Sequence, residues 1–149
     1  KKKLPKYINK YPIDKKELGK AILDDERNLK KIIDIVHPLV RAELNLFFIK
    51  YKKKQMIVLD IPLLIENKLN KKNDILIFID SKKSEINSRL KKRLNYNRKL
   101  IYNFRKLQKP LQLKKKMSNY IIKNNFKFLT IKKKVKSIKE KILNERNST

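Results

Sequence analysis

The chain has 149 residues, a net charge of +28 and no cysteine, so it can form one domain with a real core but has no disulfide framework or cysteine-based metal site. His37 is the only histidine, which also excludes a zinc site built from histidines. No apolar run is long enough to span a membrane, and no apolar signal segment follows the first residues. We therefore expect a cytoplasmic protein that makes no contact with a membrane.

The excess of lysine admits two explanations. Tyrosines among many lysines are typical of nucleic-acid-binding proteins, and this function is one alternative. However, lysine, isoleucine and asparagine, which have A/T-rich codons, are all abundant, whereas glycine occurs once and tryptophan is absent. The lysines are also spread over every predicted element. We therefore attribute most of the charge to codon bias and expect only non-specific affinity for polyanions, without a specific nucleic-acid partner.

The first third of the sequence predicts helices. Residues 1–12 are basic and aperiodic and are predicted to form an exposed lead-in. Asp14 is predicted to cap a helix, with Glu17 completing a capping box. A second amphipathic helix follows and is predicted to end at His37, because the residue before a proline is pushed out of helical geometry. A third helix is predicted to begin at Pro38.

Two apolar runs predict neighbouring parallel strands. Residues 56–59 form a short run with β-branched residues, which is typical of a buried strand, and Pro62 should end it. Residues 74–80 form a second run with an acid at each end. Asp60 follows the first run, at the edge where open α/β sheets bind ligands. The alternative is that Asp60 only caps the turn.

The last third predicts further helices and one strand. A cationic helix is predicted to start at Ser81 or Ser84, and another helix is predicted to break and restart at 108–111. Residues 120–122 predict a short strand. Thr130 is predicted to cap a last amphipathic helix.

Five segments then form a recognisable series. They are residues 13–20, 35–40, 59–67, 108–111 and 120–125. The most specific are the His-Pro-Leu and Asp-Ile-Pro-Leu-Leu-Ile-Glu sequences within the second and third segments. In order and spacing the series resembles the dephospho-CoA kinase family. The resemblance implies transfer of the γ-phosphoryl group of ATP, with Mg²⁺, to the 3′-hydroxyl of dephospho-CoA, which is the last step of coenzyme A synthesis.

The resemblance also implies a fold and a division of the chain. The implied fold is α/β, a three-layer P-loop kinase fold with a parallel sheet and with helical substrate and lid regions. Residues 1–12 are then the lead-in, 13–143 a single partial kinase domain, and 144–149 a tail. Within the domain, residues 13–55 form a helical CoA-side region and residues 56–80 the core strands. Residues 81–118 form the lid helices, and residues 119–143 the last strand and the C-terminal helix.

The sequence contains no phosphate loop of the kind that this family uses, because Gly19 is its only glycine. We expect the first strand, the loop and the first helix to lie upstream of an N-terminally truncated member. The 149 residues alone are then expected to bind CoA-like ligands weakly and to transfer no phosphate. The alternative is an inactive remnant of such a kinase.

The resemblance assigns roles to individual residues. Asp60 is the catalytic candidate, which binds Mg²⁺ directly or through water, or orients the acceptor; no other metal ligand is predicted. The candidates for binding dephospho-CoA are His37, Pro38, Pro62, Leu63 and Leu64. The candidates for the ATP and lid side are Arg89, Arg93, Gln108 and Lys114. The alternatives are a structural cap at His37, core packing at residues 62–64 and solvated cations on the lid.

The lid departs from the family pattern in three places. Arg89 and Arg93 are four residues apart and therefore predicted to share a helix face, from which they could clamp phosphates. Leu94 stands where the family has an aspartate. Lys114 and Lys115 stand where the family has cationic residues, but a lysine cannot reproduce the forked contacts of an arginine. Residues 118–119 also replace the family's alanine-aspartate pair. The sequence predicts no oligomeric state.

Overall fold

A computed structural model describes residues 4–8 and 11–147 of the chain. Two compact units are present in it. The first, the helical unit, contains the described residues up to Pro62 together with Asn97–Lys106. The second, the sheet unit, contains Leu63–Tyr96 and the described residues from Leu107 onward. The predicted domain boundaries stay a prediction.

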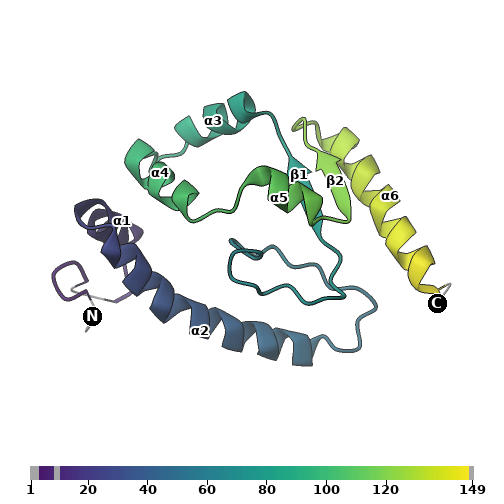
Figure 1. Cartoon of the computed structure of the whole chain (residues 1–149), viewed down its shortest axis with the longest axis horizontal. Coiled ribbons are helices and arrows are strands. Elements are labelled where there is room, and N and C mark those ends of the chain that lie inside the picture. The colour runs from purple at the N-terminus through teal and green to yellow at the C-terminus, as the bar shows by residue number, and fades with distance from the viewer. Residues whose placement is uncertain (1–3, 9–10, 148–149) are drawn as a thin grey trace. The chain divides into compact units, whose positions relative to one another are not determined.

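The helical unit is built from three helices, labelled in Figure 1: α1 (Lys15–Asp24), α2 (Arg27–Lys50) and α4 (Arg98–Lys106). Asp14 caps α1 as predicted, because its Oδ1 accepts the backbone N–H of Lys16 at 2.8 Å. Helices α1 and α4 contact each other. A Cβ added at Gly19 would lie 3.4 Å from Leu100 of α4, an ordinary van der Waals distance, so the two helices lie close together at this point.

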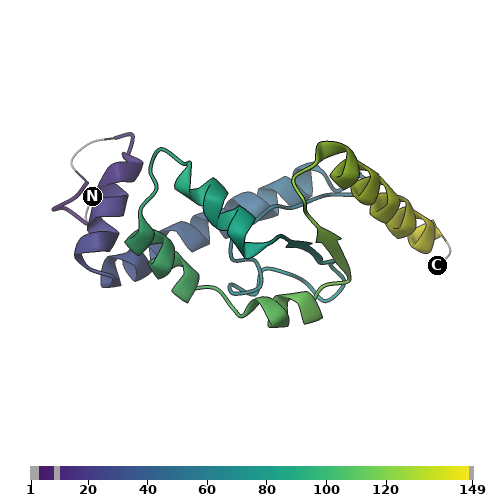
Figure 2. The same ribbon diagram turned by 90° about the horizontal axis from the view of Figure 1, so that it is seen from above.

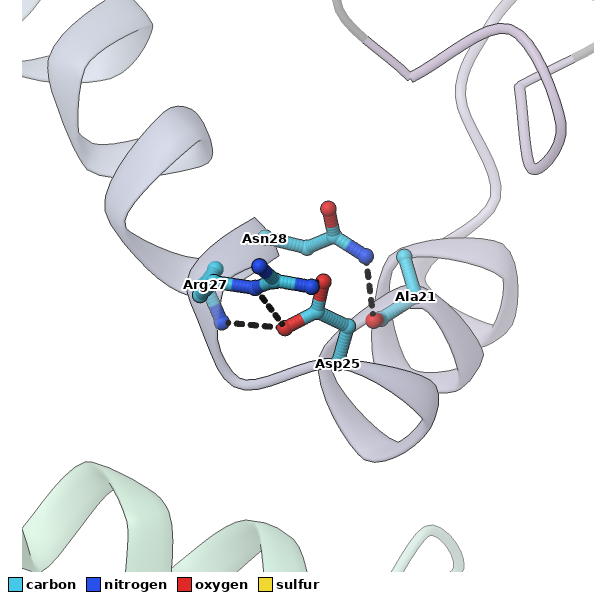
Figure 3. A network of polar contacts seen from close by, with 4 residues as sticks. All are labelled: Ala21, Asp25, Arg27 and Asn28. Atoms are coloured by element: carbon cyan, nitrogen blue, oxygen red, sulfur yellow. Dashed lines mark hydrogen bonds and ion pairs between the residues drawn. The ribbon is translucent and has the colours of Figure 1, made fainter.

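The corner between α1 and α2 is held by polar contacts (Figure 3). Asp25 Oδ1 accepts the backbone N–H of Arg27 at 2.9 Å and its Nε–H at 3.0 Å. The side chain of Asn28, which is 4% exposed, donates to the carbonyl oxygen of Ala21 at 2.8 Å. The same carbonyl also accepts the backbone N–H of Asp25 at 3.2 Å, so the Asn28 bond is a second contact at the end of α1.

The predicted break at His37 and Pro38 is wrong, because α2 runs unbroken through Pro38. Proline lacks the N–H that would bond the carbonyl of Asp34, so one helical hydrogen bond is lost there. Apolar residues of α2 continue on both sides of the proline, although several of them, such as Val36, Leu39 and Phe47, are exposed. Among the described helices, including α2, none combines the length and apolar character needed to cross a bilayer.

The predicted exposed lead-in is wrong for Leu4 and Ile8. These side chains are 4% and 6% exposed, respectively. A turn brings them together, since the N–H of Ile8 donates to the carbonyl oxygen of Leu4 at 3.1 Å. Two apolar residues four positions apart lie on one side of such a turn, and their burial removes apolar surface from water.

The sheet unit contains two parallel strands, β1 (Ile77–Asp80) and β2 (Tyr120–Lys123). Ile77 pairs with Tyr120 and Asp80 with Lys123. Ile122, the buried side chain of β2, is 3% exposed. Three helices complete this unit, and the last of them packs on β2 (Figures 1 and 2). They are α3 (Lys83–Lys91), α5 (Leu111–Lys116) and α6 (Phe128–Asn147).

The strand predicted at residues 56–59 is wrong. Residues 56–61 have no regular secondary structure, and Val58 is 81% exposed. No other described segment forms a hydrogen-bonded ladder with them, and a strand needs such a partner. The second predicted strand forms only over β1, and its parallel neighbour is β2, at the strand predicted for 120–122. The α/β class with a parallel sheet is confirmed.

The predicted start of the last helix is also wrong. Helix α6 begins at Phe128, two residues before the predicted cap Thr130. The side chains of Asn124 and Asn125 accept the N–H groups two residues ahead of each, at 2.8 and 3.1 Å, and so organise the turn before the helix. The predicted tail is helical as far as Asn147. Neither predicted serine caps α3, which has no side-chain cap bond.

Candidate functional site

One carboxylate joins two of the recognised segments within the sheet unit. Glu66 lies in the turn at residues 63–68, and its Oε1 accepts the backbone N–H of Lys109 at 2.8 Å. The same oxygen lies 2.6 Å from Nζ of Lys114 on α5. The side chains of Lys114 and Glu66 are only 17% and 9% exposed, respectively. Glu66 therefore anchors α5 to the turn.

These contacts keep Glu66 ionised. Burial acts to raise the pKa of its carboxyl group, but the hydrogen bonds from Lys114 and from the Lys109 N–H favour the charged form more strongly. The net result is a pKa below the ordinary value of 4.5. Glu66 is thus a carboxylate throughout the neutral pH range.

A second ion pair fixes the neighbouring lysine of α5. Nζ of Lys115 lies 2.8 Å from Oδ2 of Asp80, the last residue of β1. It also lies 5.6 Å from the centre of the Phe78 ring. Adjacent lysines of one short helix therefore bind an acid from the turn and an acid from the carboxyl end of β1. That end is where parallel sheets commonly bind ligands.

The turn at 63–68 has an unusual backbone. Leu63 and Lys68 have φ angles of 56° and 52°, in the left-handed region that side chains other than glycine rarely adopt. The turn is closed by bonds from the N–H of Asn67 to the carbonyl of Leu63 (3.0 Å) and from the N–H of Leu69 to that of Leu64 (3.1 Å). The predicted wall residues Leu63 and Leu64 are both half-buried. Such strain is retained where surrounding contacts hold it in place.

The predicted arginine clamp is wrong in its geometry. Helix α3 ends at Lys91, so Arg93 lies beyond it, and the two arginines do not share a helix face. Arg89, in the last turn of α3, stacks its guanidinium 3.8 Å from the centre of the Phe126 ring. Phe126 has a left-handed φ of 59°, and its N–H donates to Asn124 at 2.8 Å.

The remaining candidates lie in the helical unit or on the surface. Asp60 is exposed within the irregular segment at 56–61, and Pro62 after it is also exposed. In the middle of α2, His37 is half-buried and Pro38 exposed. Gln108 is exposed and precedes the bonded Lys109. Over the described range, no group of three or more acids and histidines is arranged to hold a metal ion.

The structure therefore brings together part of the predicted site. Within the sheet unit, the contacts of Glu66 join Lys114 and the residue after Gln108 to the turn that carries Leu63 and Leu64. Sequence reasoning did not single out Glu66 or Asp80 as site residues. Their signal is an acid directly after an apolar run, which the sequence interpretation used for Asp60 alone.

Comparison with known proteins agrees with the segments listed above. Residues 8–129 match the family model for dephospho-CoA kinase. The dephospho-CoA kinase of Wolbachia sp. subsp. Brugia malayi is 32% identical over 123 residues, which cover 81% of this chain and 63% of the relative. That of Bacillus thuringiensis subsp. konkukian is 32% identical over 131 residues, covering 87% and 66%, respectively. That of Lactobacillus acidophilus is 29% identical over 143 residues, covering 93% and 71%.

The chain thus spans a little under two-thirds of the first of these relatives, at 63% of its length. The family match nevertheless covers most of the chain and includes all or part of each recognised segment. It also includes Glu66, Lys109 and Lys114, which join two of those segments in space. The chain belongs to the dephospho-CoA kinase family.

Proposed function

We propose that this chain supplies the acceptor side and part of the phosphate side of a kinase that transfers the γ-phosphoryl group of ATP to the 3′-hydroxyl of dephospho-CoA. The observation that supports it most directly is the anchoring of α5 by Glu66. This contact joins the Asp-Ile-Pro-Leu-Leu-Ile-Glu segment to the Gln-Lys-Pro-Leu segment, two of the sequences through which the chain resembles the family. We further propose a P-loop kinase fold in which β1 and β2 are two strands of the central sheet.

Roles for the chain's own residues follow from their surroundings. Leu63 and Leu64, half-buried in a strained turn, are proposed as the wall that faces the pantetheine or adenosine part of dephospho-CoA. His37 and Pro38 are proposed to contact the same substrate from α2. Arg89 and Gln108 are proposed to face the ATP phosphates.

The roles of Lys114 and Lys115 differ from a simple grip on phosphate. Each ammonium already contacts a carboxylate, at 2.6 and 2.8 Å. An ammonium has three donors, so a phosphate contact is compatible with these pairs. The main electrostatic partner of each lysine is nevertheless its carboxylate, Glu66 for Lys114 and Asp80 for Lys115. Arg93, beyond the end of α3, is proposed to act as a separate phosphate ligand rather than as half of a clamp with Arg89.

Asp60 is the residue that would hold Mg²⁺. In kinases this ion is usually bound through one or two carboxylates together with substrate phosphates and water, so one exposed carboxylate fits that chemistry. The ion would neutralise charge on the transferred phosphoryl group. The use of ATP also motivates the predicted cytoplasmic location, which stays a prediction.

The proposed function is tested by comparing two proteins. The first is encoded by the complete natural reading frame that contains these residues, and the second is the 149-residue chain. ATP, Mg²⁺ and dephospho-CoA are supplied, and formation of CoA is followed by chromatography. We expect turnover from the first protein if it carries a glycine-rich phosphate loop, and only weak binding of dephospho-CoA, measured by calorimetry, from the second.

Three controls sharpen the comparison. An Asp60→Asn variant should lose most of the turnover, because a neutral amide is a poor Mg²⁺ ligand. An Asp34→Asn variant, altered at an exposed acid of α2, should keep it. CoA already carrying the 3′-phosphate should not be an acceptor. A loop-containing protein that folds but transfers no phosphate would favour the inactive remnant instead.

A further inference from the structure

The structure points to Glu66 as a positioning residue for phosphoryl transfer, which holds Gln108 and α5 in register with the turn at 63–68. This inference rests on the proposed function and extends it to a residue that need touch neither substrate. Glu66 bonds to a backbone N–H that lies 43 residues away in the sequence, so it sets a tertiary rather than a local arrangement.

The bond to Lys109 fixes the chain directly before α5. Pro110, which follows, has no N–H and adopts a φ of −53° as the residue that caps α5. The N–H of Lys109 is therefore the last backbone donor before the helix. Held at 2.8 Å by Glu66, it also sets the position of the preceding Gln108.

The bond to Lys114 fixes the other end of the same turn of helix. The N–H of Lys114 donates to the carbonyl of Pro110 at 3.2 Å, so Lys109 and Lys114 bracket the first turn of α5. Helix α5 has only six residues. Helices this short are unstable alone, and their position depends on external contacts. Within the described residues, those contacts include the Glu66 pair and the Lys115–Asp80 pair.

The acceptor side depends on the same carboxylate. Glu66 lies three residues after Leu63, whose left-handed backbone persists only if the turn is held. Loss of the carboxylate should therefore loosen the turn and α5 together. A displacement of about 1 Å in a group that positions substrate can reduce a catalytic rate by about 100-fold.

The test uses the protein that shows turnover in the assay above. Glu66→Ala, Glu66→Gln and a control, Glu85→Ala, are compared at a temperature well below unfolding, with kcat expressed per folded molecule. Glu85 is exposed on α3 and carries no proposed role. We expect Glu66→Ala to lower kcat by at least about 10-fold with a smaller change in KM. Glu66→Gln should recover most of the loss, because its amide oxygen still accepts the Lys109 N–H.

Lys114→Met provides a second route if Glu66→Ala fails to fold. For Lys114→Met, a positioning role predicts a lower kcat with an unchanged KM for ATP. For Glu66→Ala it predicts faster hydrogen exchange at the Lys109 amide, whereas Glu66→Gln, which still accepts that N–H, should stay close to wild type. A large rise in the KM for ATP in Lys114→Met, with an unchanged kcat, would identify Lys114 as a direct phosphate ligand and overturn the inference. So would a Glu66→Ala protein that is less stable but has normal kcat per folded molecule.

The proposed function and the inference about Glu66 are contradicted by different results. If the wild-type protein has no turnover, the proposed function and the inference fall together. If the wild-type protein turns over and Glu66→Ala matches it per folded molecule, only the inference falls.

Discussion

Two buried asparagines of the helical unit have opposite surroundings. Asn28 is 4% exposed and donates to the carbonyl oxygen of Ala21. Asn103 on α4 is 3% exposed, and neither of its side-chain polar atoms has a hydrogen-bond partner in the described structure. Removing a buried polar group that lacks a partner avoids a desolvation cost of about 1–3 kcal/mol. The same change at Asn28 loses its bond to Ala21, whose carbonyl then keeps only the backbone N–H of Asp25.

We predict that Asn103→Leu raises the free energy of unfolding by about 1 kcal/mol or more, whereas Asn28→Leu lowers it by about 0.5–1.5 kcal/mol. The measurement is urea unfolding followed by circular dichroism. The matched pair controls for the general effect of a larger apolar side chain. A loss of stability in both variants would mean that the Asn103 amide has a partner in solution.

The ionisation of Glu66 makes a pH-dependent contribution to stability. Its pKa is lowered on folding, so the contribution is present above the unfolded value, near 4.5, and is lost as the pH falls through the lower folded value. A charge-assisted hydrogen bond of this kind contributes about 1.5–3 kcal/mol. We predict that Glu66→Gln is less stable than wild type at pH 7 and that the difference shrinks below about pH 4.

The check is urea unfolding of both proteins over this pH range. Glu85→Gln, which alters an exposed carboxylate of α3, is the control and should track wild type. A difference between Glu66→Gln and wild type that is constant from pH 7 to pH 3 would show that the carboxylate's charge is not responsible.

At the scale of elements, some local signals predicted boundaries correctly, whereas the caps at Thr130 and at the serines before α3 did not form. Asp14 marks the start of α1, and Pro110 precedes α5, because capping and proline chemistry act within a few residues. Residues 56–59 carry strand composition but form no strand, since a strand needs a partner that composition cannot specify. Helix α2 passes through Pro38, so the effect of a proline on the residue before it did not end the helix there.

The continuity of α2 leads to a prediction at Pro38. A proline inside a helix costs about 3 kcal/mol, partly offset because it also restricts the unfolded chain. Pro38 is exposed, so its replacement disturbs little packing. Pro38→Ala should therefore raise the free energy of unfolding by roughly 1–3 kcal/mol, measured with urea and the helical signal at 222 nm.

Leu39→Ala is the control for Pro38→Ala, because Leu39 is 62% exposed on the same helix and its truncation should have a much smaller effect. An unchanged or lower stability of Pro38→Ala would indicate that α2 is interrupted at His37 in solution, as the sequence pattern had suggested.

At the scale of the whole molecule, the sequence indicated the family but not the contacts. The recognised segments hold Glu66 and Lys109, and the order of those segments is visible in the sequence. The 2.8 Å hydrogen bond between Glu66 and the Lys109 N–H cannot be read from the sequence, because no local rule relates residues that are 43 positions apart. The arginine clamp failed for a related reason. Two residues four positions apart share a face only if both lie in the same helix, and α3 ends before Arg93.

The net charge of +28 gives the last prediction. If the charge reflects codon bias, binding to polyanions depends on counterion release alone and is indifferent to their sequence and structure. The 149-residue chain should then bind single-stranded DNA, duplex DNA and heparin with similar strength at about 50 mM salt, and lose at least about 100-fold in affinity by 200 mM.

Fluorescence anisotropy over a salt series measures this salt dependence. Because each neutralised phosphate adds to the salt dependence, the slope of log affinity against log salt reports how many cations take part. A preference of 100-fold or more for one nucleic acid that persists at 200 mM salt would instead require base or shape readout, and would establish nucleic-acid recognition as a function of this chain.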